Sequence, residues 1–121
     1  EPGAADKPIH GAPHAHQWLR DGDQLYLVDF DRFGLGDPEL EVATFLAEWD
    51  FESDSFMSGV GDAYFDGFAG VMPLNHRLVG AYRLHKYVAK ALRTLTAIRL
   101  DAAERALAIL EDAATRVRRL V

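Results

Sequence analysis

Acidic side chains dominate the middle of the sequence, between Asp21 and Asp66, whereas basic residues are common from Arg77 onward. A concentration of carboxylates attracts cations, either metal ions or amines. The same composition also describes a solvated surface, and the charge pattern alone favours neither interpretation. The net charge of −6 argues against a general nucleic-acid surface, which needs a basic footprint to displace counterions from phosphates.

Histidines near the beginning of the sequence offer a second kind of chemistry. His14 and His16 are two residues apart, so both would face the same way on an extended strand. Neutral imidazoles are suitable zinc ligands, and Asp29 or Asp31 would complete such a site. One hypothesis is therefore a zinc-binding hydrolase, and its alternative is that both histidines are exposed loop residues.

The elements that must position these side chains form two regions, residues 8–36 and residues 37–121, after a flexible leader at residues 1–7. Asp21-Gly22-Asp23 is a strong turn signal between two apolar runs. It predicts a buried β-hairpin, with the strands Trp18–Arg20 and Gln24–Asp29. Glycines predict a loop over residues 33–36.

Helical patterns fill the second region. Asp37-Pro38 predicts a helix start, because the aspartate caps free N–H groups and proline fits the first helical position. Further helices are expected at about residues 56–68, 74–98 and 102–120. His85 falls on the apolar face of the long helix, which predicts a buried histidine. The fold class is therefore α+β and mostly helical, with a hairpin followed by about four helices.

One stretch, residues 10–43, carries several short motifs in a fixed order. It reads HGAPHAHQWLRDGDQLYLVDFDRFGLGDPELEVA. This order and spacing resemble the catalytic core of aminoglycoside phosphotransferases, choline kinases and related small-molecule kinases. The family pattern is H-G-D-x-x-x-x-N, a hydrophobic hairpin ending in Asp-Phe or Asp-Trp, and then G-D-P-x-x-D-L-A at the start of a helix. The resemblance implies the carboxy-terminal lobe of a protein-kinase-like fold.

The resemblance also implies roles for individual residues. Asp29 takes the place of the metal-holding aspartate, and Gln17 that of the metal-binding asparagine. Asp31 would point the same way as Asp29 if the segment is extended. The family's catalytic aspartate falls at Ala12, which can neither orient an acceptor hydroxyl nor accept its proton. The resemblance therefore implies Mg²⁺ and ATP as cofactors, and no intact catalytic base.

Other roles follow from the same resemblance. His10 and Asp37 would brace the catalytic loop. A hydroxylated, cationic small-molecule acceptor would lie near the acidic side chains Glu48, Asp50 and Glu52.

The family holds ATP with an amino-terminal lobe that contains a Gly-rich loop and a strand lysine, and only nine residues precede His10. We therefore expect a partner, either the missing lobe or a second copy of the chain, and an inactive chain without it. The alternative is a catalytically dead module that binds a ligand or a partner protein. The absence of cysteine is compatible with the cytoplasm. No apolar run approaches the ~20 residues that span a bilayer, so neither a membrane nor a nucleic acid is an expected partner.

Overall fold

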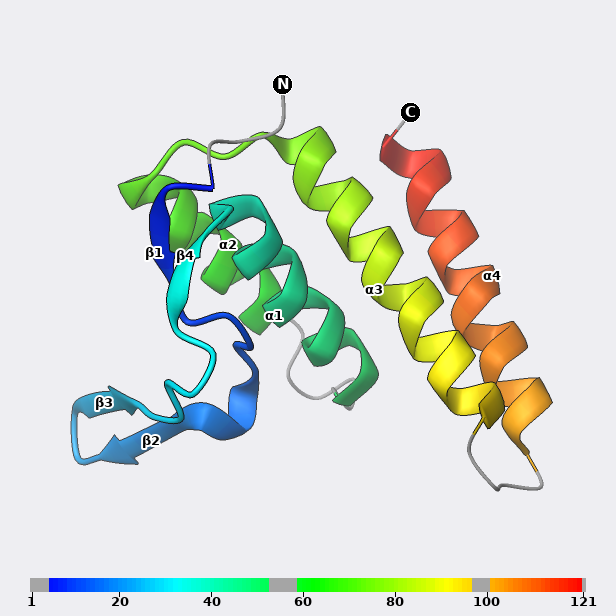
Figure 1. Cartoon of the computed structure of the whole chain (residues 1–121), viewed down its shortest axis with the longest axis horizontal. Coiled ribbons are helices and arrows are strands. Elements are labelled where there is room, and N and C mark those ends of the chain that lie inside the picture. The colour runs from blue at the N-terminus through cyan, green and yellow to red at the C-terminus, as the bar shows by residue number, and fades with distance from the viewer. Residues whose placement is uncertain (1–4, 53–58, 97–100, 121) are drawn as a thin grey trace.

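A computed structural model describes residues 5–52, 59–96 and 101–120 of the chain. Within these residues the fold is α+β and mostly helical, as predicted, with two small antiparallel sheets and four α-helices. The sheets lie on one side of α1 and α2, and the antiparallel pair α3–α4 lies on the other (Figure 1). No helix in the described part of the chain is long and apolar enough to cross a membrane.

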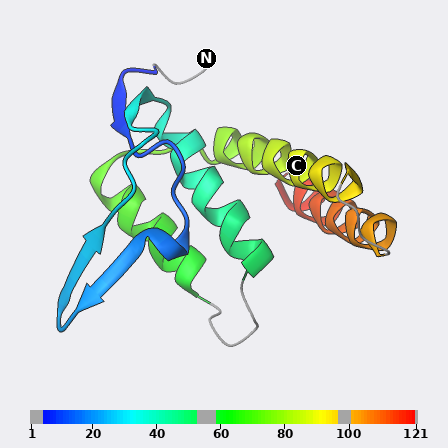
Figure 2. The same ribbon diagram turned by 60° about the horizontal axis from the view of Figure 1, so that its bottom comes forward.

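The predicted hairpin is present but lies in solvent. Strand β2 (Trp18–Asp21) pairs with β3 (Gln24–Leu27), and Gly22 adopts a positive φ of 59° in the turn between them. Both strands are largely exposed, and the hairpin projects away from the helices (Figure 2). The prediction of a buried hairpin was therefore wrong. The apolar residues are there, but no other described element covers them.

A second pairing was not predicted. Strand β1 (Lys7–Ile9) pairs antiparallel with β4 (Gly34–Gly36), where a loop was expected, and Lys7 belongs to a strand rather than to the leader. Gly36 lies so close to Ile9 that a Cβ atom would come within 2.2 Å of the Ile9 side chain. Gly36 thus leaves room for the end of the Ile9 side chain, a contact that the local turn residues do not reveal.

The helices follow the predicted order. They are α1 (Pro38–Glu52), α2 (Val60–Val71), α3 (His76–Thr96) and α4 (Ala102–Leu120). Residues 56–58 and 97–98 of the predicted helices lie outside the described residues. Asp37 caps α1 through its Oδ1 atom, which accepts the Glu39 N–H at 3.0 Å. Asn75 does the same for α3, where its Oδ1 accepts the Arg77 N–H at 3.1 Å.

The core is built around α1. Val42, Ala43 and Leu46 pack with Val79 of α3, and Tyr64, Phe65 and Phe68 of α2 close the cluster. The face predicted for α3 is wrong in part, because His85 is exposed while Tyr87 and Ala91 are buried. Small residues, chiefly Ala91, Ala106 and Ala113, lie buried where α3 and α4 approach. Several leucines therefore remain on the outside: Leu92, Leu95, Leu107 and Leu110.

Candidate functional site

The His10 loop is fixed to both helix α1 and the end of strand β3. The backbone N–H groups of His10 and Gly11 donate to the two carboxylate oxygens of Glu41, each at 3.0 Å. The His10 ring lies 2.9 Å from the Val28 carbonyl oxygen through Nε2, and its centroid is 4.9 Å from that of Phe30. The bracing role expected of His10 is consistent with these contacts. The sequence did not single out Glu41 as the anchor.

Gly11 allows the two polar loops to touch. Its φ is 89°, and a Cβ atom there would lie 2.2 Å from the Arg32 carbonyl oxygen. No L-amino acid with a side chain fits such a contact without movement of the backbone. The loop that begins at His10 and the segment from Val28 to Arg32 are therefore neighbours, as the kinase resemblance requires. Ala12 follows Gly11 in this loop and is half-buried.

Asp29 stands at the junction of these two loops. It is exposed, and it is the one non-glycine residue with a positive φ (66°) in the described part of the chain. Aspartate tolerates this left-handed conformation better than most residues, and such conformations concentrate at functional sites. The Gln17 side-chain amide donates to Asp29 Oδ2 at 3.4 Å, so two predicted metal ligands lie together.

The amide of Gln17 is turned the wrong way for a metal ligand. Its nitrogen faces Asp29, while its oxygen accepts the His14 N–H at 3.0 Å. A metal ion would require the oxygen instead, and turning the amide would give up the bond to His14. Gln17 is also almost fully buried. Asp29 is therefore the available ligand, and Gln17 positions it.

The expectation that Asp31 points the same way as Asp29 assumed an extended segment. The segment is not extended, because residues 31 and 32 form a turn closed by a 2.9 Å hydrogen bond from the Phe33 N–H to the Phe30 carbonyl. The alternation of side chains along a strand therefore does not apply. Asp31 is exposed.

The zinc hypothesis receives no support from the arrangement of histidines. The rings of His14 and His16 have centroids 5.8 Å apart in an edge-to-face arrangement. Among the residues that the structure describes, no three His, Asp or Glu side chains come together as a metal site requires. A structural or catalytic zinc ion needs at least three protein ligands.

Asp37 is held by two hydrogen bonds at the start of α1. Besides capping α1, its Oδ2 atom accepts the Tyr82 hydroxyl at 2.9 Å. Burial alone would raise the pKa of Asp37, but the hydrogen bonds with Glu39 and Tyr82 outweigh it and lower the pKa below its ordinary value. Asp37 therefore stays ionised and joins α1 to α3, as a bracing residue would.

The predicted acceptor-binding residues, Glu48, Asp50 and Glu52, differ in their surroundings. Asp50 accepts hydrogen bonds from Arg83 and Tyr87, and its other oxygen lies 3.4 Å from an Arg116 nitrogen. Burial, and then the bond to Asp50, raise the pKa of Tyr87, so its hydroxyl stays protonated. Because two arginines already pair with Asp50, its negative charge is balanced within the chain, and its binding of a cationic acceptor stays a prediction. Glu48 is half-buried, and the Glu52 side chain lies outside the described residues.

No family model, curated protein or solved structure matches this chain.

Proposed function

We propose that this chain is the metal-contacting lobe of a small-molecule phosphotransferase-like protein, similar to the aminoglycoside phosphotransferases and choline kinases. The observation that carries the proposal is Asp29, an exposed carboxylate in a left-handed conformation where the two polar loops meet. Glu41, Gly11 and the His10 ring hold those loops together. The support is the coincidence of this geometry with the order of motifs in the sequence.

The donor set fits a magnesium ion that a nucleotide brings with it. Mg²⁺ is commonly bound through one or two carboxylates together with substrate phosphates, rather than by a cage made only of protein. Asp29 supplies one such carboxylate, and ATP would supply the phosphate oxygens. The ion would neutralise charge on the phosphates. Gln17 would keep Asp29 in place through its amide nitrogen.

Ala12 makes this chain a poor catalyst in the proposal. Its methyl group cannot accept a proton from an acceptor hydroxyl. Binding of a nucleotide–metal complex does not need the catalytic base. In the proposal, the chain therefore binds this complex without turning it over. The second candidate function, a catalytically dead binding module, follows from the same observation.

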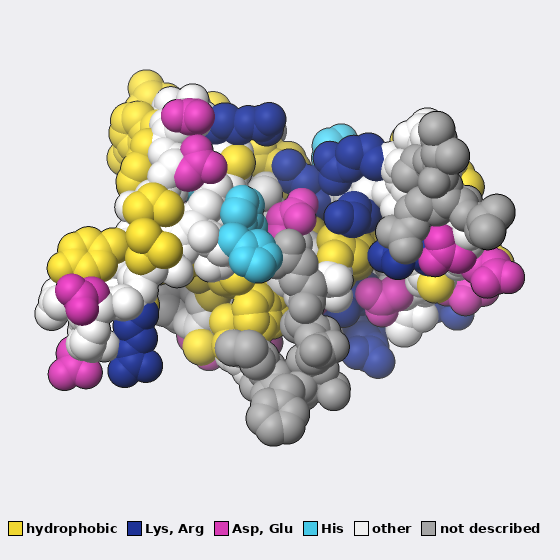
Figure 3. Space-filling model, turned by 90° about the horizontal axis from the view of Figure 1, so that it is seen from below, with side chains coloured by type: hydrophobic (Ala, Val, Ile, Leu, Met, Phe, Trp, Pro, Cys, Tyr) yellow, Lys and Arg dark blue, Asp and Glu magenta, His cyan; other side chains and the backbone are white. Residues whose placement is uncertain are grey.

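Exposed apolar side chains on the β2–β3 hairpin fit a covering partner. Leu19 and Tyr26 lie opposite each other on one face of the hairpin, and Trp18 and Leu25 lie on the other face. Apolar side chains are visible over the hairpin at the left of Figure 3. Exposed apolar side chains on a projecting hairpin are commonly covered by another protein surface. In the proposal, the nucleotide-binding lobe expected from the resemblance packs here, next to the loop that ends in Asp29.

A calorimetric titration separates the two candidate functions. Mg²⁺ with ATP and, separately, an amino sugar are titrated into the chain. We expect weak binding of Mg²⁺–ATP, because only part of the nucleotide site lies on this chain, and we expect Asp29→Asn to reduce it further. Binding of the amino sugar without any binding of the nucleotide would favour the dead module and count against the phosphotransferase-like lobe.

A further inference from the structure

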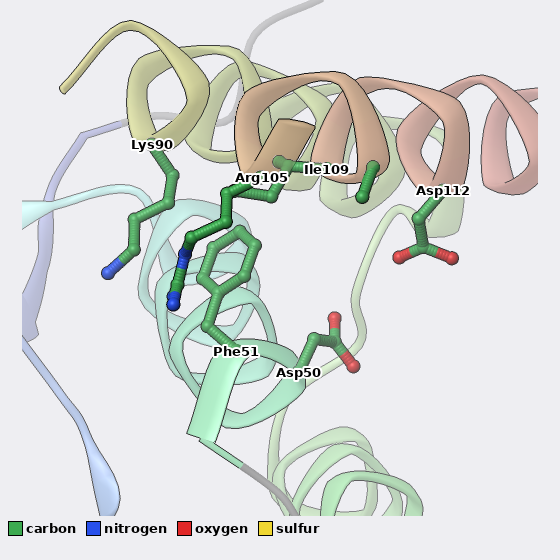
Figure 4. Close-up of a pocket in the computed structure, with 7 residues that line it drawn as sticks. Asp50, Phe51, Lys90, Arg105, Ile109 and Asp112 are labelled. Atoms are coloured by element: carbon green, nitrogen blue, oxygen red, sulfur yellow. The ribbon is translucent and has the colours of Figure 1, made fainter. Parts of the chain in front are cut away.

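A groove lies between the last turn of α1 and the α3–α4 pair, in a part of the fold that the proposed function does not use (Figure 4). Its volume is about 390 Å³, within the range of small-molecule sites. The residues that line it come from three helices: Asp50, Phe51, Lys90, Arg105, Ala108, Ile109 and Asp112.

The floor of the groove is an aromatic ring in a fixed position. The Phe51 ring packs edge-on against Tyr87, with centroids 5.0 Å apart, and Tyr87 is only 1% exposed. The hydroxyl of Tyr87 is in turn held by Asp50. Ala108 and Ile109 add apolar surface from α4. A flat apolar group would find a preformed surface here, so little ordering would be needed on binding.

The acidic side of the groove is already neutralised. Asp50 is paired with Arg83 and Arg116, and Asp112 accepts the Arg116 Nε–H at 2.9 Å. Burial alone would lower the pKa of Arg116, but its bonds to Asp112 and Asp50 outweigh this and raise it. Arg116 therefore remains charged, and neither carboxylate has an unmatched negative charge to offer a cationic ligand.

The basic side of the groove carries positive charge that is not matched in this way. The Lys90 ammonium lies 5.2 Å from the centroid of Phe51, and among the described residues no carboxylate comes within ion-pair distance of it. Arg105 is half-exposed, and its pairing with Asp101 is loose at 3.9 Å. Figure 4 shows both side chains at the same end of the groove, beside Phe51 and away from Asp50 and Asp112.

We infer that this groove binds a small organic anion with a flat apolar body, of the kind represented by an aromatic phosphate monoester. The anionic group lies between Lys90 and Arg105, where both cations can donate hydrogen bonds to its oxygens. The ring lies along Phe51 and Ile109. The acidic sequence around Asp50 suggested a cationic ligand, whereas the ligand proposed for this groove is an anion. It does not depend on metal chemistry at Asp29.

Phenyl phosphate is the probe that tests this site. We expect saturable binding to the whole chain, followed by calorimetry at low salt or by amide chemical shifts, with the shifts centred on Phe51, Lys90 and Arg105. Two comparison compounds separate the features of the ligand. Inorganic phosphate keeps the anion without the ring, and benzylamine keeps the ring with the opposite charge. Both are expected to bind more weakly than phenyl phosphate.

Charge-removing variants identify the residues. Lys90→Gln and Arg105→Gln are each expected to weaken phenyl phosphate binding about tenfold. Arg77→Gln is the matched control: it removes the same charge from an exposed position near the other end of α3 and should leave the affinity unchanged. Phe51→Leu should reduce the preference for phenyl phosphate over inorganic phosphate. Circular dichroism confirms that each variant is folded.

Three results would overturn the inference. One is the absence of saturable binding of phenyl phosphate at concentrations up to about 10 mM, because a dissociation constant above that value is too weak for a specific site. Another is binding of benzylamine at least as tight as that of phenyl phosphate. The third is equal weakening by Lys90→Gln and the Arg77→Gln control, which would show a general effect of net charge.

Discussion

Glu41 is the residue on which the geometry of the candidate site most depends. It is buried, and both of its carboxylate oxygens accept backbone N–H groups of the His10 loop. In Glu41→Gln one of those oxygens becomes an amide nitrogen that faces a donor. A buried donor without an acceptor costs about 1–3 kcal/mol. We therefore expect the free energy of unfolding, measured by urea denaturation, to fall by that amount.

Glu39 provides a matched control for this change. It is also a buried glutamate of α1, but a single oxygen accepts a single backbone group, the Asn75 N–H, at 2.8 Å. Glu39→Gln keeps an amide oxygen for that bond, so its loss of stability should be clearly smaller. Equal losses in the two variants would show that Glu41 acts through its charge alone, and the anchoring account of the His10 loop would be wrong.

At the scale of elements, small residues decide how α3 meets α4. Ala113 is 2% exposed, whereas Leu107 on the same helix is 57% exposed. We expect Ala113→Leu to lower the free energy of unfolding by about 1–3 kcal/mol, because it overpacks a close helix contact. Leu107→Ala should change it by less than about 0.5 kcal/mol. Thermal and urea unfolding of both variants checks this contrast. A larger loss of stability in Leu107→Ala than in Ala113→Leu would show that the buried face of α4 is assigned incorrectly.

The sequence predicts the local elements better than their burial. Asp37-Pro38 and the turn at Gly22 each contain a local reason for the structure that forms, so the start of α1 and the hairpin were predictable. The pairing of β1 with β4 was not, because it depends on contact between Ile9 and Gly36, which lie far apart in the chain. Apolar periodicity likewise does not predict that Leu107 is exposed. It cannot distinguish an alanine-lined contact from a leucine-lined one.

In the candidate site, too, some features were predictable from the sequence and others depend on tertiary contacts. Asp29 and Gln17 were predicted to lie together from the order of motifs, and they do. The orientation of the Gln17 amide was beyond the sequence, since it depends on the His14 backbone. The ion pairs of Asp50 were beyond the sequence for a related reason: its partners Arg83 and Arg116 come from other helices, and only the tertiary structure brings their charges to it.

At the scale of the whole molecule, the two proposed sites differ in charge: one is built on the Asp29 carboxylate and the other on the cations Lys90 and Arg105. Asp29 lies beside the exposed hairpin, where a metal ion and a covering lobe are proposed. The groove at Phe51 lies against α3 and α4, on the side where basic and acidic side chains are mixed at the right of Figure 3. A ligand at one site need not influence the other, so each can be tested without the other.

Manganese-induced broadening of the amide signals is the most direct test of the central claim, that Asp29 contacts a nucleotide-bound metal ion. Mn²⁺ replaces Mg²⁺ as a paramagnetic probe and is added with ATP to the whole chain. The account predicts broadening centred on Asp29, Gln17 and the His10 loop, lost in Asp29→Asn and retained in Asp31→Asn. Broadening that is centred elsewhere, or that survives Asp29→Asn, would contradict it.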